Sequence, residues 1–160
     1  VRAMEFLTRH REMLQILNPV DEFVLLETSA DKLGYTHVKL AQQYQSIPVW
    51  NSRISLHFDA EGELYQVQGD YIPTPDSLDL DNSLPAVEII RLLHASGELV
   101  PQEQYDAEKI IYHGQQQPAV LAYLFTPASG QSINTGGIIV DATTARILLR
   151  EPRLQTLQLK

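Results

Sequence analysis

Hydrophobic positions recur along the first part of the chain at two different spacings. Between residues 3 and 17, apolar side chains return at steps of three and four, which predicts an amphipathic helix that ends before Pro19. A short apolar run at 23–27 predicts a strand. Further along, apolar and polar residues alternate, which predicts an antiparallel meander with one buried face. The alternating segments are residues 36–45, 48–58 and 63–71.

The parity of the apolar positions also predicts how these segments pair. One register brings the large apolar residues to a single face, with a three-residue loop at 46–48 and a second loop at 59–62. The same register places His37 directly opposite His57 on the polar face. The expected apolar pairs are Val38–Leu56, Leu40–Ile54, Tyr44–Trp50, Leu56–Tyr65 and Ile54–Val67.

The second half of the chain repeats this outline. Residues 72–84 hold two Pro and three Asp, which is typical of a linker. Ser83 and Pro85 then favour the start of a helix, and Gly97 favours its end. Strands are expected at 107–112, 118–125, 136–141 and 145–150.

These patterns predict an α+β fold of cystatin-like or PepSY-like type. We expect two subdomains, each a helix packed on an antiparallel sheet. The expected divisions are a first subdomain at 1–75, a linker at 76–83, a second subdomain at 84–150 and a C-terminal tail at 151–160.

Composition and charge narrow the range of functions. The chain of 160 residues carries a formal net charge of −8, so anionic nucleic acid and membrane surfaces are poor partners. It contains no Cys, which excludes disulfides, thiol catalysis and Cys-based zinc sites. No apolar run approaches the roughly 20 residues that span a bilayer. The start, Val1–Glu5, is not a signal peptide, so a secreted form would have lost its signal.

The motifs of common enzymes are missing from the sequence. It has no His-Glu-x-x-His zinc motif, no Gly-x-Ser-x-Gly nucleophile turn and no phosphate-binding Gly loop. We therefore expect a non-catalytic protein with no catalytic residues and no cofactor.

Two groups of side chains are candidate metal ligands. The first is the pair His37 and His57, but two imidazoles are fewer ligands than a zinc site needs. The second is the acidic set Asp76, Asp79 and Asp81, which lacks the Gly turn and terminal Glu of a calcium loop. We expect no metal at either place, and a mild loss of stability in acid as the two imidazoles become charged.

Several short motifs occupy the predicted meander. They are His37-Val38 with Gln42 and Tyr44, then Ile47-Pro48-Val49, then His57 with Asp59 and Gly62, and finally Val67 with Gly69. This set resembles the fungalysin/thermolysin propeptide (FTP) domain. Beyond the linker, Ala122-Tyr123-Leu124 and Val140-Asp141-Ala142 resemble a PepSY domain.

The resemblance implies the propeptide of a secreted, bacterial, thermolysin-like zinc metalloprotease. Such a pro-region acts as an intramolecular chaperone and inhibitor of its catalytic domain, which would be the partner here, and keeps the precursor a zymogen. Its location would be extracellular or periplasmic. Two alternatives stay open: an orphan PepSY-type secreted binding or inhibitory protein, and a structural envelope module.

The C-terminal tail is the candidate inhibitory segment. Residues 146–160 carry four basic residues against one acidic residue, a local charge of +3. An extended segment with alternating apolar side chains can enter a protease cleft as an added strand, whereas the alternative interpretation is a frayed chain end. The residues expected to contact the protease are Arg150, Arg153, Leu154, Leu157 and Leu159.

Overall fold

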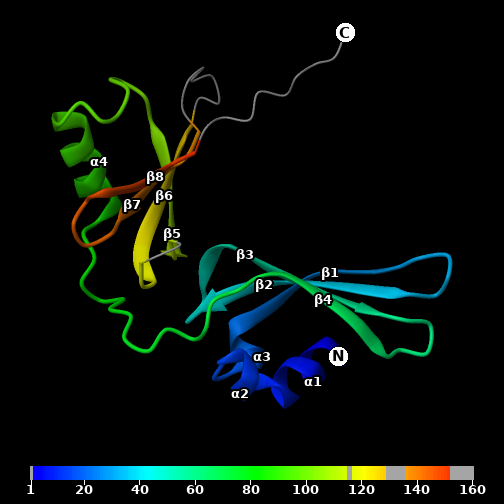
Figure 1. The fold of residues 1–160 in the computed structure, drawn as a ribbon. Coiled ribbons are helices and arrows are strands. Elements are labelled where there is room, and N and C mark those ends of the chain that lie inside the picture. The colour runs from blue at the N-terminus through cyan, green and yellow to red at the C-terminus, as the bar shows by residue number, and fades with distance from the viewer. Residues whose placement is uncertain (1, 115–116, 129–135, 152–160) are drawn as a thin grey trace, which may run out of the picture. The chain divides into compact units, whose positions relative to one another are not determined.

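The computed structural model describes residues 2–114, 117–128 and 136–151 (Figure 1). Contacts between Cα atoms divide the chain into two compact units, Val1–Ser77 (unit 1) and Leu78–Lys160 (unit 2). Each unit is described by itself below.

Unit 1 opens with three short helices where the apolar periodicity predicts one. They are α1 (Arg2–Arg9), α2 (Arg11–Leu14) and α3 (Pro19–Glu22). His10 leaves helical geometry with ψ 14°, and Gln15 closes α2 in the left-handed region with φ 58°. Pro19 lies in the first turn of α3, where its missing N–H costs nothing, so it also begins a helix.

The sheet of unit 1 consists of four antiparallel strands. They are β1 (Phe23–Ala30), β2 (Thr36–Tyr44), β3 (Ile47–Phe58) and β4 (Leu64–Asp70). Between β2 and β3 the expected register is confirmed for Val38 with Leu56, Leu40 with Ile54, and His37 with His57.

The other end of the β2–β3 hairpin differs from the expected register. A bulge between Ala41 and Gln43 shifts the pairing, so that Tyr44 lies opposite Ile47 and the expected pair with Trp50 is wrong. The connection consequently shrinks to two residues, Gln45 and Ser46, with φ of 47° and 66°. Positive φ at both positions is the geometry of a type I′ hairpin turn, whose twist suits flanking strands.

The pairing of β3 with β4 also differs from the expectation. A bulge between His57 and Phe58 places Val67 opposite Leu56, and Gly69 opposite Ile54. The expected pairs of Leu56 with Tyr65 and of Ile54 with Val67 are therefore wrong. The side chains of Tyr65 and Val67 are 51% and 45% exposed, so the apolar alternation of this strand does not report burial.

One hydrophobic core holds unit 1 together. Buried side chains from α1 and the loop after α2 pack with buried side chains of β1, β2 and β3. The core residues are Ala3, Leu7, Ile16, Phe23, Val38, Leu40, Ile54, Leu56 and Phe58.

Unit 2 contains one helix and four strands. The helix α4 (Ala86–Ala95) buries Ile89 and Leu93, and Gly97 follows it with φ 76°. Consecutive strands pair antiparallel, and Ala145 takes φ 58° in the turn before the last of them. The strands are β5 (Tyr105–Tyr112), β6 (Val120–Pro127), β7 (Ile138–Asp141) and β8 (Ile147–Arg150).

The expected fold class, an α+β fold with a helix packed on a sheet in each of two subdomains, is wrong. The described residues are mostly β-sheet, with eight strands and few helices. Strands make up most of the described secondary structure, whereas the helical stretch at the start of the chain is interrupted at His10 and Gln15. The longest described helix, α4, has only 10 residues.

Candidate functional site

The two histidines predicted to face each other on the polar face of the sheet form a close pair in unit 1. His37 on β2 and His57 on β3 have their Nδ1 atoms 2.7 Å apart and their ring centroids 4.9 Å apart. At this distance one Nδ1 carries a hydrogen and donates it, while the other accepts it. The pair therefore joins the two strands by a side-chain hydrogen bond in addition to their backbone ladder.

The surroundings of the two rings are different. His37 Nε2 lies 3.7 Å from Asp31 Oδ2, in the turn between β1 and β2. His57 Nε2 is buried and has no hydrogen-bond partner among the described residues. Burial, followed by the neighbouring His37, lowers the pKa of His57. Burial alone would raise the pKa of Asp31, but backbone hydrogen bonds from Tyr35 and Leu33, together with His37, lower it.

Within the part of the chain that the structure describes, no group of three or more His, Cys, Asp or Glu side chains could hold a metal ion. Asp79 of the acidic set is instead tied to its own turn. It accepts hydrogen bonds from the backbone N–H groups of Asp81 and Asn82 and from the Asn82 side chain. These bonds, those from Asn82 first, lower the pKa of Asp79.

A buried polar cluster fixes the segment that leaves β4, residues 72–74, which we call the strap. The Gln42 side chain acts on Ile72 as a neighbouring strand would: its Nε2 donates to the Ile72 carbonyl at 2.7 Å, and its Oε1 accepts from the Ile72 N–H at 2.9 Å. Ser52 donates to the same Oε1 at 2.8 Å. Gln42 is 2% exposed and Ser52 5%, so these bonds satisfy groups that water does not reach.

A second cluster holds the end of the strap. The Thr74 hydroxyl lies 2.8 Å from both carboxylate oxygens of the buried Glu22 and accepts from the Leu17 N–H. The Thr74 N–H donates to the Gln15 carbonyl at 3.0 Å. Sequence reasoning missed both clusters, although Gln42 and Ser52 carried a signal: they are polar residues at positions whose parity points inward.

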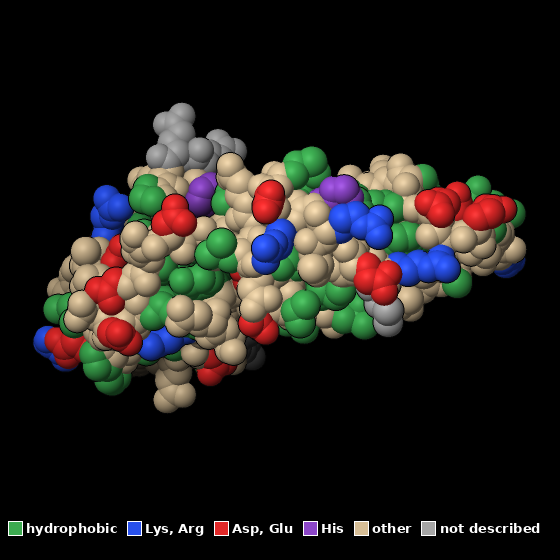
Figure 2. Space-filling model, turned by 90° about the horizontal axis from the view of Figure 1, so that it is seen from below, with side chains coloured by type: hydrophobic (Ala, Val, Ile, Leu, Met, Phe, Trp, Pro, Cys, Tyr) green, Lys and Arg blue, Asp and Glu red, His purple; other side chains and the backbone are tan. Residues whose placement is uncertain are grey.

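A groove runs beside the strap on unit 1. It has a volume of about 620 Å³ and lies between the α2–α3 region, the β2–β3 turn and residues 74–76. Leu17 and Val20 line it with side chains that are 70% and 64% exposed. Figure 2 shows that, on the face it draws, hydrophobic side chains are scattered among acidic and basic ones.

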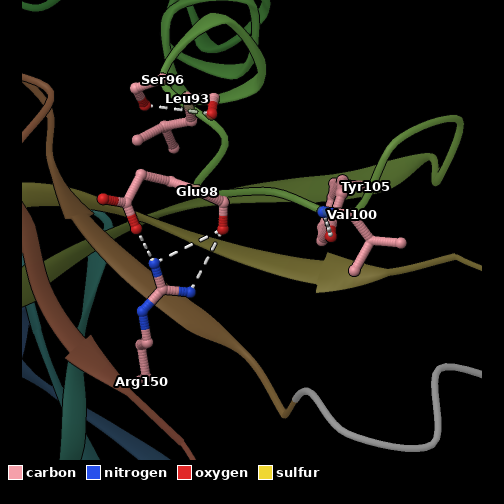
Figure 3. Close-up of polar contacts among 6 residues, drawn as sticks. All are labelled: Leu93, Ser96, Glu98, Val100, Tyr105 and Arg150. Carbon is pink, nitrogen blue, oxygen red and sulfur yellow. Dashed lines mark hydrogen bonds and ion pairs between the residues drawn. The ribbon is translucent and has the colours of Figure 1, made fainter.

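One of the residues predicted to contact a protease, Arg150, lies within the described chain. Its guanidinium donates to the Glu98 carbonyl at 3.3 and 3.4 Å and also pairs with the Glu98 carboxylate (Figure 3). Glu98 belongs to the loop after α4, whose start is closed by a Ser96 hydroxyl bond to the Leu93 carbonyl. The other predicted contacts, Arg153, Leu154, Leu157 and Leu159, lie outside the described residues.

No helix among the described residues is long and apolar enough to cross a membrane.

Part of unit 1 is similar to a known protein family. Residues 21–71 match the family model described as the Fungalysin/Thermolysin Propeptide Motif. The match runs from α3 to the residue after β4, and within it the resemblance to this propeptide motif is confirmed. The matched family is a non-catalytic pro-region. A search of curated proteins found no match.

Among solved structures, the chain is similar to the Bacillus megaterium YpeB C-terminal domain. The alignment covers 94% of this chain and 61% of that chain, with 17% sequence identity and a TM-score of 0.39. The chain thus spans less than two thirds of that structure's length, and a likeness this distant indicates neither fold nor function. The PepSY resemblance of unit 2 stays a prediction.

Proposed function

We propose that this chain is the propeptide of a secreted, thermolysin-like zinc metalloprotease, and that it assists the folding of the catalytic domain and inhibits it. The observation that carries the proposal is the match of residues 21–71 to the propeptide motif. The proposed arrangement is an FTP-like region at 1–75, a linker at 76–83, a PepSY-like region at 84–150 and an inhibitory tail at 151–160. The precursor would act outside the cytoplasm.

The motif residues of the matched segment have identifiable structural roles, which supports the assignment. Gly69 has φ 118°, and a Cβ there would lie 2.1 Å from the Arg53 carbonyl oxygen, so no larger residue fits beside β3. Gly62 closes the β3–β4 hairpin with φ 86°. The Gln42 side chain makes the two backbone hydrogen bonds to Ile72 that a neighbouring strand would otherwise make. These three residues of the matched segment therefore shape the sheet and hold the chain that leaves its last strand.

Unit 1 carries ten large apolar side chains that are exposed among its described residues, so they are available to a partner. A catalytic domain that folds against this unit would cover such side chains. Those that are at least 37% exposed in unit 1 are Met13, Leu17, Val20, Val24, Leu25, Leu26, Leu33, Tyr65, Val67 and Tyr71.

Arg150 has a specific part in this proposal. The inhibitory tail would begin directly after β8, and the bonds between Arg150 and Glu98 anchor the last residue of that strand to unit 2. A tail that begins from a fixed point reaches a cleft with less loss of chain entropy than one that begins from a mobile point. We therefore propose that Arg150 positions the tail, and that Arg153, Leu154, Leu157 and Leu159 contact the enzyme.

The test begins with the reading frame that encodes this chain. A His-Glu-x-x-His motif within the next 150–200 residues, about the size of one domain, is the expected result. The encoded catalytic domain, purified without its pro-region, should then lose peptidase activity in proportion to added chain. A reading frame without a zinc-protease motif, or a catalytic domain that stays fully active with excess chain, would overturn the proposal.

A further inference from the structure

The His37–His57 pair has a geometry that accommodates one proton between its rings and not two. With the Nδ1 atoms 2.7 Å apart, a single hydrogen completes the bond, whereas two hydrogens would point at each other. A doubly protonated pair would in addition bring two positive charges together. The bond is therefore compatible with a pair in which both rings are neutral or only one ring is charged.

Of the described groups that face the pair, only Asp31 is anionic, and it lies beside His37 and not beside His57. On the side of β1, Ser29 lies opposite His37, and the Asp31 carboxylate is near the His37 ring. On the side of β4, Gln66 lies opposite His57, and the Tyr65 ring is 6.1 Å from the His57 ring.

The charged neighbours on β1 and β2 neutralise each other. Along the same face of the sheet, Lys39 and Glu27 form an ion pair of their own at 2.8 Å. The carboxylate of Asp31 thus faces His37, while the buried Nε2 of His57 meets no acceptor among the described residues. Whichever ring donates in the neutral pair, a charged His57 carries a hydrogen on this Nε2 without a partner there, next to another imidazole.

We propose that the His37–His57 pair is an acid-sensitive clamp between β2 and β3, and that its double protonation loosens unit 1 and releases the chain from the metalloprotease. The release from the metalloprotease rests on the proposed function, whereas the loosening of unit 1 concerns the chain alone. The pair responds to protons, and both histidines lie within the segment that matches the propeptide motif.

The pair lies near the open end of the β2–β3 hairpin, so separating the two rings affects the pairing of these strands. It lies between the buried pair Val38–Leu56 and the end of the ladder at Thr36–Phe58. The other end of the same hairpin is already bulged at Ala41–Gln43. Parting the two rings would consequently weaken the regular end of the β2–β3 ladder, where the core residues Leu56 and Phe58 are held.

The sign of the pH effect follows from His57. Its pKa is lowered in the folded chain, whereas an unfolded His titrates near its ordinary value of about 6.5. Below that pH the unfolded chain binds more protons than the folded chain, so stability falls as pH falls. The contribution of the pair is fully present above pH about 6.5 and is lost progressively below it.

Measurements on the purified chain test the clamp itself. Between pH 7.5 and 5.5 the melting temperature of the wild type should fall by roughly 5 °C more than that of His57→Gln and of His37→Gln. His113→Gln, which changes an exposed histidine just after β5, is the matched control and should follow the wild type. In NMR titrations His57 should titrate below its ordinary range. Equal pH dependence in all four proteins, or an ordinary titration of His57, would overturn the clamp.

A second measurement separates the clamp from the proposed function. The complex of the chain with the catalytic domain of its own precursor should dissociate at least about tenfold more readily at pH 5.5 than at 7.5, and this change should shrink in His57→Gln. A pH-independent complex of a chain that melts as expected would overturn the release step. A chain that melts as expected but binds no catalytic domain at either pH would overturn the proposed function and leave the clamp standing.

Discussion

At the scale of single residues, the polar side chains that matter most in unit 1 are the buried ones. Gln42, Ser52 and Glu22 are each no more than 5% exposed, and each is hydrogen-bonded to backbone groups or side chains. Their bonds fix the strap, residues 72–74, against the body of the unit. Of the residues in these bonds, Glu22 and Thr74 also line the groove beside the strap.

Leu56 should be a large contributor to the stability of unit 1. Its side chain is fully buried in the core, so Leu56→Ala should lower the free energy of unfolding by about 2–5 kcal/mol. Urea unfolding measures this directly. Leu33→Ala, at a site that is 73% exposed, is the control and should change stability little. Equal midpoints for the two variants would mean that Leu56 faces water.

Gln42 should matter for a different reason. Gln42→Ala removes the partner of the Ile72 N–H and of the Ile72 carbonyl, and leaving buried groups unpaired costs about 1–3 kcal/mol, whereas the Ser52 hydroxyl keeps the Asp70 carbonyl as a partner. Chemical denaturation should show this loss, and hydrogen exchange at the Ile72 amide should accelerate. Gln68→Ala, at an exposed position on β4, should show neither effect. An unchanged Ile72 amide in Gln42→Ala would refute the role given to this side chain.

At the scale of elements, the sequence predicts strands well and irregularities poorly. The parity of Val38, Leu40, Ile54 and Leu56 predicts the middle of the β2–β3 ladder correctly, because a one-residue slip would turn all four side chains to water. The two bulges interrupt this parity: at the first, residues 49–52 of β3 lie opposite Gln42 alone, and at the second Tyr65 is the extra residue of β4. Parity assumes an unbroken ladder, so it does not predict such insertions.

The helices show the same limit. The apolar spacing over residues 3–17 is helical throughout, yet the chain leaves the helix at His10 and turns left-handed at Gln15. Local propensity does not include contacts with residues far along the chain. One such contact is the backbone bond from Thr74 to Gln15, which joins residues far apart in the sequence. The strap was missed for this reason, whereas the His37–His57 pair followed from register alone.

Gly69 tests the packing of β4 on β3. Gly69→Ala would place a Cβ 2.1 Å from the Arg53 carbonyl oxygen at φ 118°, so the strand must shift, at a cost of about 2–4 kcal/mol. Gly97→Ala is a matched control: it also has positive φ, 76°, but nothing lies within 4 Å of its Cβ. Thermal unfolding should therefore show a larger loss for Gly69→Ala. Equal losses would show that position 69 requires glycine because of its backbone conformation and not because of the contact with β3.

At the scale of the whole molecule, the proposed function gives the folded body and the tail different roles. The body binds the catalytic domain, and the tail inhibits it. Deleting residues 151–160 should weaken inhibition of the catalytic domain at least about tenfold, while direct binding of the body falls by less than about threefold. Arg150 and its bonds to Glu98 remain in the shortened chain, so the body should keep its stability. Titrating both forms against enzyme activity and against a binding signal makes the comparison. Equal inhibition by both would place the inhibitory contact in the body.

The central claim, that this chain is a pro-region that folds its own protease, is tested most directly by refolding. The catalytic domain of the same precursor is unfolded, diluted out of denaturant with or without one equivalent of the chain, and assayed after the chain has been digested. The account predicts a severalfold higher recovery of peptidase activity with the wild-type chain and a smaller gain with Gly69→Ala. The same recovery with and without the chain would contradict it.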